Sequence, residues 1–200
     1  MSASREAPLE VPSVRDEDQD LLDRLAANDE AAFQQLVQRH IDRAFGLALR
    51  ILGTRADAED VVQDTFLKVW IRRGEWQEGR ARFSTWLYRV VTNRCIDLRR
   101  RPRTDDVDAI PEPADSQPDA VSAMHRNEVN VMLEEAMGLL PEQQRVAVIL
   151  SYHEDMSNAE IADVMDTTVS AVESLLKRGR QQLKKLLRRS EGDIRHTFTD

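Results

Sequence analysis

The stretch RARFSTWLYRVVTNRCIDLRRR, residues 80–101, indicates the fold most clearly. It holds three of the chain's ten aromatic residues and seven arginines, although the 200-residue chain has a formal net charge of −8. Apolar residues recur in it at the three- and four-residue spacing of an amphipathic helix. We therefore predict a helix from about Thr85 to Arg100, capped by Ser84.

The two sides of this predicted helix differ in chemistry. At about 100° per residue, the side that would face a core carries Leu87, Val90, Val91 and Leu98. Another side carries Trp86, Arg89, Asn93 and Arg100. The second side suits a single-stranded nucleic acid, because bases stack on aromatic rings, base edges meet amides and phosphates meet guanidinium groups. The periodicity is equally compatible with a tryptophan buried against another helix and surrounded by solvated arginines.

Helical signals also precede this stretch. Apolar residues from Leu21 to Leu52 recur at helical intervals, and we expect a break near Asn28 and an end at Gly53. The next predicted helix contains DAEDVVQDTFLKVW, residues 57–70, with acidic residues in its first turn, where the helix dipole favours them. Residues 20–101 are therefore expected to form one small helical domain.

An acidic, proline-rich segment follows. Four of the chain's seven prolines lie between residues 102 and 118 together with five acidic residues, and no helical apolar spacing accompanies them. We expect a flexible linker over residues 102–125, so that the flanking domains need not touch each other. Residues 1–19 are expected to form a disordered tail and residues 190–200 a second tail.

The pattern after the linker predicts a helix-turn-helix within a domain of residues 126–189. Pro141 opens the helix of PEQQRVAVILSYHE. Ser157 and Glu160 form a capping box for a short helix, and a third helix begins near Val169. Its inward residues are expected to be Val172, Leu175, Leu176 and Leu183, and its outward residues Glu173, Ser174, Lys177, Arg178 and Gln181. This arrangement is typical of a recognition helix, although an ordinary helical hairpin fits too. The expected fold class is all-α, with two small helical domains.

Charge and composition narrow the function. Residues 72–103 and 173–189 are strongly basic, whereas residues 1–30 and 104–136 are acidic; basic runs alone are often only solvated faces. We expect a cytoplasmic protein, because no apolar run reaches the roughly 18 residues that span a bilayer and the N-terminus lacks a secretory pattern. The single cysteine, Cys95, permits no internal disulfide or zinc site and is expected to be a small buried residue. No metal, cofactor, small-molecule substrate or catalytic residue is expected.

Several motifs in order resemble those of one family. DAEDVVQDTFLKVW, FSTWLYRVVTNRCIDLRRR, the linker, LPEQQRVAVILSYHEDMSNAEIADVM and a basic terminal helix resemble bacterial RNA polymerase sigma factors of the extracytoplasmic-function class of the sigma-70 family. The resemblance covers about residues 20–188. It implies sigma regions 2 and 4, which bind core RNA polymerase and direct it to promoters, here of a stress or envelope response. It also implies an anti-sigma partner, which in this family is often membrane-tethered.

The resemblance assigns a role to each motif. It implies polymerase-binding residues on the helix of residues 57–70: Asp60, Gln63, Asp64, Leu67 and Trp70. It implies contacts to a melted minus-10 element from Arg80, Arg82, Ser84, Trp86, Arg89, Asn93 and Arg100. It implies contacts to the duplex minus-35 element from Thr168, Ser170, Glu173, Ser174, Lys177, Arg178 and Arg180. Glu173 departs from the arginine that many relatives carry near this position, and a glutamate accepts from cytosine N4 rather than binding guanine.

Other classes of function stay open at this point. A stand-alone helix-turn-helix regulator would bind duplex DNA without core polymerase, but it gives no reason for the row from Trp86 to Asn93. An enzyme would use carboxylates such as Asp57 and Asp60, which capping and the helix dipole already explain. A pure interaction module leaves both basic patches unexplained.

Overall fold

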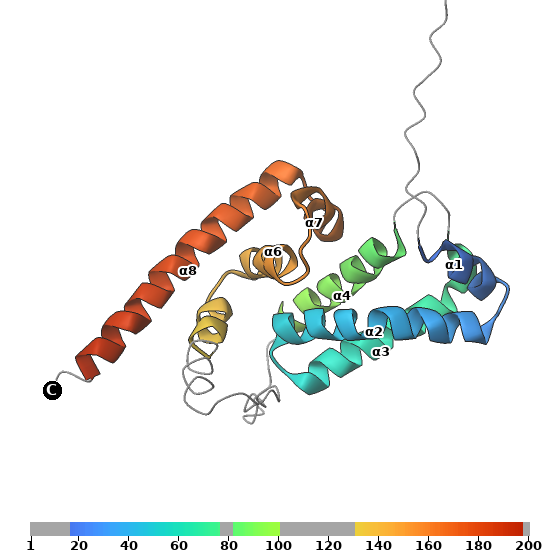
Figure 1. The fold of residues 1–200 in the computed structure, drawn as a ribbon, viewed down its shortest axis with the longest axis horizontal. Coiled ribbons are helices and arrows are strands. Elements are labelled where there is room, and N and C mark those ends of the chain that lie inside the picture. Colours follow the sequence, from blue (N-terminus) through green and yellow to red (C-terminus); the bar gives the residue numbers. More distant parts are fainter. Residues whose placement is uncertain (1–16, 77–81, 101–130, 198–200) are drawn as a thin grey trace, which may run out of the picture.

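The computed structural model describes residues 17–76, 82–100 and 131–197, and every regular element in these ranges is a helix (Figure 1). The predicted all-α class is confirmed. The N-terminal half contains α1 (Gln19–Ala26), α2 (Glu30–Leu52), α3 (Arg55–Ile71), a 3₁₀ turn η1 (Arg73–Glu75) and α4 (Phe83–Arg100). The C-terminal half contains a helical segment over residues 131–138, then α6 (Glu142–Tyr152), α7 (Asn158–Met165) and α8 (Val169–Thr197).

Local signals set the ends of α2. Its N-cap is Asp29, whose Oδ1 accepts hydrogen bonds from the backbone N–H groups of Ala31 at 2.9 Å and Ala32 at 3.2 Å. Its C-cap is Gly53, which adopts a left-handed conformation with φ of 79° that costs glycine little. The predicted break near Asn28 and the predicted end at Gly53 are both confirmed.

The start of α4 differs from the prediction. The helix begins at Phe83, so Ser84 lies inside its first turn and the prediction that Ser84 caps the helix is wrong. Phe83 is only 1% exposed and packs edge-on against the rings of His40 and Trp76. Burying this ring at the helix start stabilises the earlier beginning.

The buried face of α4 is also broader than one stripe. Leu87 and Val91 are buried as predicted, whereas Val90 and Leu98 are only partly buried. The other buried residues of the helix are Phe83, Tyr88, Thr92 and Cys95. The reason is that α4 contacts α2 and α3 and, in addition, α7 of the C-terminal half.

The C-terminal half contains the predicted helix-turn-helix. Ser157 and Glu160 form the complete capping box of α7, which ends where Asp166 adopts a left-handed conformation. In α8, Val172 and Leu176 are buried. A Cβ added at Gly179 would lie 3.0 Å from Val148 Cγ2, so α8 crosses α6 at close range. The helix continues to Thr197, so residues 190–197, which the sequence assigns to a tail, are helical.

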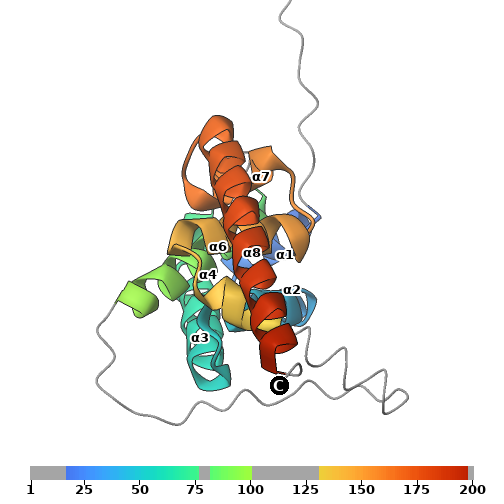
Figure 2. The ribbon, with the colours of Figure 1, turned by 90° about the vertical axis from the view of Figure 1, so that its left-hand side faces the viewer.

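The two halves touch each other. In Figures 1 and 2, α7 lies against α4, α6 lies near the end of α2, and α8 is on the side away from the N-terminal half. The buried residues of both halves form one cluster. The predicted linker, residues 102–125, lies outside the described residues, as does most of the predicted N-terminal tail. The expectation that the domains need not touch in order to act stays a prediction, since the structure shows only that they are in contact here.

Two smaller expectations concern Cys95 and the membrane. Cys95 is fully buried, which confirms its expected environment, and burial raises the pKa of its thiol to about 12. Among the described residues, no helix combines the length and apolar character that crossing a bilayer requires. The same residues hold no group of three or more side chains suited to a metal ion.

Candidate nucleic-acid interface and docking groove

An aromatic cluster supports Trp86 at the start of α4. Ring centroids lie 6.0 Å apart for Phe83 and Trp86, in a stacked geometry, and 5.9 Å apart for Trp76 and Trp86, in an edge-on geometry. Trp86 is half-buried. Its indole is thus neither buried in the core nor free in solvent, because one side is held by the cluster and the rest stays accessible.

The predicted minus-10 residues fall into two groups. Arg82, Asn93 and Arg100 are exposed, whereas Ser84, Trp86 and Arg89 are partly buried. Arg80 lies outside the described residues. Trp86 and Asn93 are two helical turns apart on α4 and lie about 10.5 Å apart along its axis. The structure therefore presents a supported ring and an exposed amide from one helix.

Two of these arginines already have partners in the C-terminal half. Arg89 donates through Nε to the carbonyl oxygen of Asp163 at 2.8 Å, and its Nη2 contacts the same oxygen. The same Nη2 lies 3.9 Å from Oδ1 of Asp166. Arg100 Nε donates to Oε2 of Glu142 at 3.1 Å.

The predicted minus-35 residues gather at the exposed beginning of α8. All seven of them are exposed: Thr168, Ser170, Glu173, Ser174, Lys177, Arg178 and Arg180. The Thr168 hydroxyl accepts from the backbone N–H of Ala171 at 3.2 Å, so it helps to cap the helix. The Nε groups of Arg178 and Arg180 donate to carbonyls of their own helix. This face is basic overall, and Glu173 is its single acidic member.

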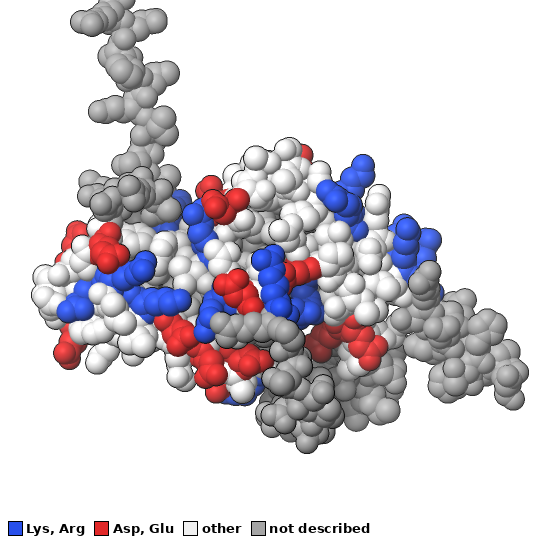
Figure 3. All heavy atoms as spheres, turned by 180° about the vertical axis from the view of Figure 1, so that it is seen from behind, with Lys and Arg blue, Asp and Glu red and all other residues white. Residues whose placement is uncertain are grey.

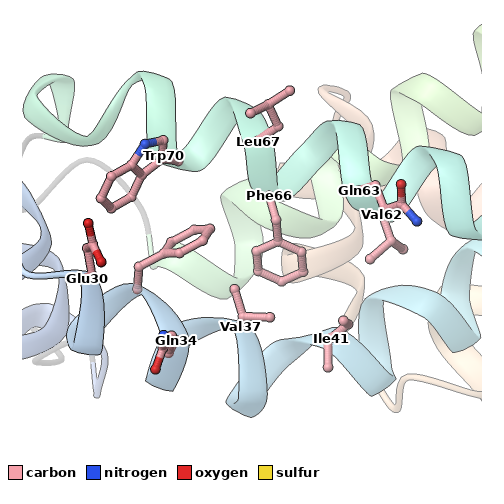
Figure 4. A pocket seen from close by; sticks show the side chains of 10 residues that line it. Glu30, Gln34, Val37, Ile41, Val62, Gln63, Phe66, Leu67 and Trp70 are labelled. Carbon is pink, nitrogen blue, oxygen red and sulfur yellow. The ribbon is translucent and has the colours of Figure 1, made fainter.

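An apolar groove runs between α2 and α3 (Figure 4). Its volume is about 490 Å³. Phe33, Val37 and Ile41 line it from α2, and the lining side chains of α3 are Val62, Gln63, Phe66, Leu67 and Trp70. Leu67 is 55% exposed, which is unusual for a leucine beside a core. Such a groove suits the apolar face of a partner helix.

Three of the five predicted polymerase-binding residues line this groove. Gln63, Leu67 and Trp70 line it, while Asp60 and Asp64 are exposed elsewhere on α3. Asp64 accepts a hydrogen bond from Arg94 Nη2 at 3.2 Å.

The orientation of Trp70 is fixed by its neighbours. The guanidinium of Arg73 lies 4.6 Å from the centroid of the Trp70 ring, and Phe33 contacts the ring at 5.2 Å between centroids. The groove residues of α2 were missed in the sequence, where Phe33, Val37 and Ile41 served only as signs of a helix. Their i, i+4, i+8 spacing does mark one helix face, but it does not say that the face is left open.

The buried carboxylate of Asp18, just before α1, contacts side chains of α2. Asp18 is 3% exposed, and its oxygens lie 2.7 Å from His40 Nε2 and 2.5 Å from Arg39 Nη1. Burial alone would raise the pKa of Asp18, but the hydrogen bonds and charges of His40 and Arg39 hold it below its ordinary value. Asp18 therefore belongs to the folded domain, although the sequence assigns it to a tail.

Comparison with known proteins gives matches over both halves. The family model for Sigma-70 region 2 matches residues 36–104, and the model for Sigma-70 region 4 matches residues 130–183. The first range includes α3, α4 and most of α2, and the second contains α6 and α7 and reaches into α8.

Two curated relatives illustrate the similarity in sequence. The ECF RNA polymerase sigma factor SigE of Mycolicibacterium smegmatis is 35% identical over 169 residues, which are 81% of this chain and 65% of that protein. The RNA polymerase sigma-H factor of Pseudomonas aeruginosa is 32% identical over 186 residues, which are 86% of this chain and 95% of that protein.

Two solved structures share the fold. CnrH, in complex with the cytosolic domain of CnrY, is 30% identical, with a TM-score of 0.63 over 85% of this chain and 96% of that one. The sigma factor RpoE of Bartonella quintana, in complex with the anti-sigma factor NepR, is 21% identical, with a TM-score of 0.61 over 78% and 96% of the two chains. The latter similarity concerns the fold alone.

Proposed function

This chain belongs to the extracytoplasmic-function class of sigma-70 factors, and on that premise we propose that it binds core RNA polymerase and directs the enzyme to particular promoters. Members of this family are transcription initiation factors and not enzymes. The chain acts in the cytoplasm, where core polymerase and chromosomal DNA meet. Its regulon belongs to a stress or envelope response.

The first step is docking on polymerase through the groove between α2 and α3. The groove offers Phe33, Val37 and Phe66 as apolar lining, and Leu67 stands exposed beside it. An exposed apolar groove with polar residues at its edge suits a helix of a protein partner. The exposed carboxylates Asp60 and Asp64 extend this surface along α3.

The second step is capture of the melted minus-10 element on α4. Trp86 is held by Phe83 and Trp76 in one orientation, which makes it a preorganised stacking platform. Extruding a base costs a few kcal/mol, whereas stacking returns about 1–3 kcal/mol per base. The two quantities nearly cancel, so contacts of polymerase with DNA must supply the remainder. This supports a factor that is active only on the polymerase.

The third step is reading of the duplex minus-35 element by α8. The side chains from Thr168 to Arg180 that we assign to DNA share one exposed helix face, and the preceding short helix and turn are typical of major-groove readers. Glu173 accepts from cytosine N4 in this reading, whereas Lys177 and Arg178 contact guanine or phosphate.

Regulation by an anti-sigma factor follows from the same surfaces. The relatives CnrH and RpoE were solved in complexes with CnrY and the anti-sigma factor NepR. A partner that covers the α2–α3 groove or the α8 face of this chain would block docking or promoter reading. A membrane-tethered partner fits a factor that responds to the envelope.

The observation that carries this proposal is that one chain has two separate faces whose side chains suit DNA, the Trp86–Asn93 side of α4 and the exposed face of α8. The test is transcription of a library of random promoter sequences by purified core polymerase with and without this chain. We expect new transcripts whose start sites share two upstream elements. A stand-alone regulator would instead bind duplex DNA without polymerase and produce no transcripts of its own.

A further inference from the structure

A buried charged pair lies behind the aromatic cluster of α4. Asp18, the N-cap of α1, is 3% exposed, and His40 of α2 is 8% exposed. His40 Nε2 donates to Asp18 Oδ2 at 2.7 Å, because an ionised carboxylate can only accept. Figure 3 shows many other charged side chains spread over one face of the molecule, where water and salt weaken their pairing. A buried ion pair adds little net stability, so the geometry that it imposes matters more than its energy.

Arg39 is a second partner of the same carboxylate. Its Nη1 lies 2.5 Å from Asp18 Oδ1 and also donates to the backbone carbonyl oxygen of Glu17 at 3.1 Å. The two oxygens of Asp18 thus bind two neighbouring side chains of α2. A hydrogen bond to an acceptor that is anchored in this way fixes the direction of His40 Nε2. The imidazole therefore has one preferred orientation.

The imidazole of His40 also contacts Phe83, the first residue of α4. The two ring centroids lie 5.2 Å apart with the planes at 64°, an edge-on arrangement that favours aromatic pairs. Phe83 is only 1% exposed, and a ring in a closely packed interior cannot move aside freely. One side chain of α2 therefore connects the carboxylate of Asp18 with the start of α4.

Phe83 in turn supports the ring that we assign to the melted promoter element. The rings of Phe83 and Trp86 are stacked, with an angle of 27° between their planes. Trp76 contacts both of them edge-on, at 5.6 Å from Phe83 and 5.9 Å from Trp86 between centroids. The support of Trp86 therefore runs from Asp18 through His40 and Phe83.

A small hollow beside these rings explains why Trp86 needs support. Its volume is about 110 Å³, and Trp76, Phe83 and Trp86 line it together with Leu22 and Leu25 of α1. Trp86 is only half-buried, so the hollow and the surrounding solvent leave its indole room to turn. The contacts with Phe83 and Trp76 restrict this rotation.

We propose that His40 is a positioning residue for minus-10 recognition: held by Asp18, its imidazole supports Phe83, and Phe83 fixes the indole of Trp86. His40 is buried and acts without touching DNA. This inference rests on the proposed function of Trp86 as the platform for an unpaired base. An indole that is already oriented loses little freedom when a base stacks on it. Loosening one such side chain is expected to weaken binding by about 2- to 10-fold.

Fluorine NMR of the full chain labelled with 5-fluorotryptophan measures the surroundings of the indole directly. The chain has three tryptophans and gives three signals, which single replacements by phenylalanine assign. Trp70 is an internal reference, because it lies on α3 and its ring has other contacts. His40→Gln removes the ring and keeps an amide donor for Asp18. It should shift and broaden the Trp86 signal and leave the Trp70 signal unchanged. An unaltered Trp86 signal in folded His40→Gln would overturn the proposal.

Ile51→Val is the matched control for a general loss of stability. Ile51 is buried on the same helix, α2, about 16 Å from His40 along the helix axis. Its replacement should lower the free energy of unfolding and leave the Trp86 signal in place. Equal changes of the Trp86 signal in Ile51→Val and His40→Gln would assign the effect to destabilisation and refute the positioning role.

His40→Phe separates the ring from the hydrogen bond. Phenylalanine keeps an aromatic ring against Phe83 but cannot donate to Asp18, so the buried carboxylate loses a partner. In urea titrations His40→Phe should be less stable than His40→Gln, yet its Trp86 signal should lie closer to that of the natural chain. A purely structural role for His40 predicts the same order of the two variants in both measurements. If His40→Phe does not fold, the comparison of His40→Gln with Ile51→Val still decides.

The second measurement is the affinity of core polymerase carrying the chain for a promoter fragment with a duplex minus-35 element and a single-stranded minus-10 element, its sequence taken from the transcripts described above. His40→Gln should weaken binding by about 2- to 10-fold and should cause no further loss in a chain that already carries Trp86→Ala. Additive losses would show that His40 acts through other contacts, against the proposal. If Trp86→Ala alone leaves the affinity unchanged, the proposed function of Trp86 fails, whereas the fluorine signals separately show whether His40 supports its ring.

Discussion

Arg89 and Asp163 lie 74 positions apart in the sequence, yet the Arg89 guanidinium donates to the Asp163 backbone carbonyl oxygen at 2.8 Å. One residue belongs to the helix that we assign to the melted promoter element and the other to the helix-turn-helix. The guanidinium that we propose for DNA is therefore bound by the protein itself in this structure.

We expect Glu173 to determine the preferred base at one position of the minus-35 element. A carboxylate accepts from cytosine N4, whereas arginine donates to guanine O6 and N7, and each good contact of this kind discriminates by about 1–3 kcal/mol. Glu173→Arg should therefore shift the preference at one position from cytosine toward guanine in the promoter library. Because Glu173 is exposed, the melting temperature should not change. An unaltered preference at every position would show that Glu173 does not read bases.

Leu67 is expected to matter for binding to core polymerase. It is 55% exposed and lines the α2–α3 groove, so Leu67→Glu should weaken binding at least 10-fold while leaving the fold intact. Ile71 on the same helix is 65% exposed but does not line the groove. Ile71→Glu is thus a matched control, which should bind normally in a fluorescence titration with core polymerase. Equal loss in both variants would remove the groove from the binding surface.

Asp18 is expected to stabilise the fold in a pH-dependent way. Its pKa is lowered in the folded state, so its contribution is fully present above the unfolded value of about 3.9 and disappears as pH falls through the folded value. Asp18→Asn should lower the free energy of unfolding by about 1.5–3 kcal/mol at pH 7, the range for hydrogen bonds to charged groups.

Urea titrations at several pH values measure this difference. The gap between Asp18→Asn and the natural chain should stay constant from pH 7 to pH 5 and close below about pH 4. The control is Asp42→Asn at an exposed position of α2, which should have little effect at any pH. A gap for Asp18→Asn that persists unchanged to pH 2 would mean that its carboxylate charge contributes nothing.

Local sequence signals were sufficient for most helix boundaries. Asp29 caps α2, Gly53 ends it in a left-handed conformation, and Ser157 with Glu160 caps α7. Each signal acts within four residues, so it can be read without knowing the rest of the fold. The exposed face of α8 was predicted for the same reason, since helical spacing alone separates Glu173 and Lys177 from Val172 and Leu176.

Features that depend on distant residues were not predictable. Phe83 moved the start of α4 because His40 and Trp76 provide a site for its ring. The groove exists because α2 and α3 pack without covering Phe33 and Val37, and helical spacing alone does not show which apolar residues stay uncovered. The contact of Arg89 with α7 depends on the two halves packing together, and local periodicity does not indicate this packing. The roles of the individual DNA- and polymerase-binding residues stay predictions.

The central claim is that Trp86 meets an unpaired base while the chain is bound to polymerase. The most direct measurement is the affinity of core polymerase carrying this chain for a promoter fragment with a duplex minus-35 element and a single-stranded minus-10 element. Loss of one stacked base is worth about 1–3 kcal/mol, so Trp86→Ala should weaken binding by about 5- to 150-fold, and Trp86→Phe should weaken it less. If Trp86→Ala, shown to be folded and bound to polymerase, holds the fragment as tightly as the natural chain, the claim is contradicted.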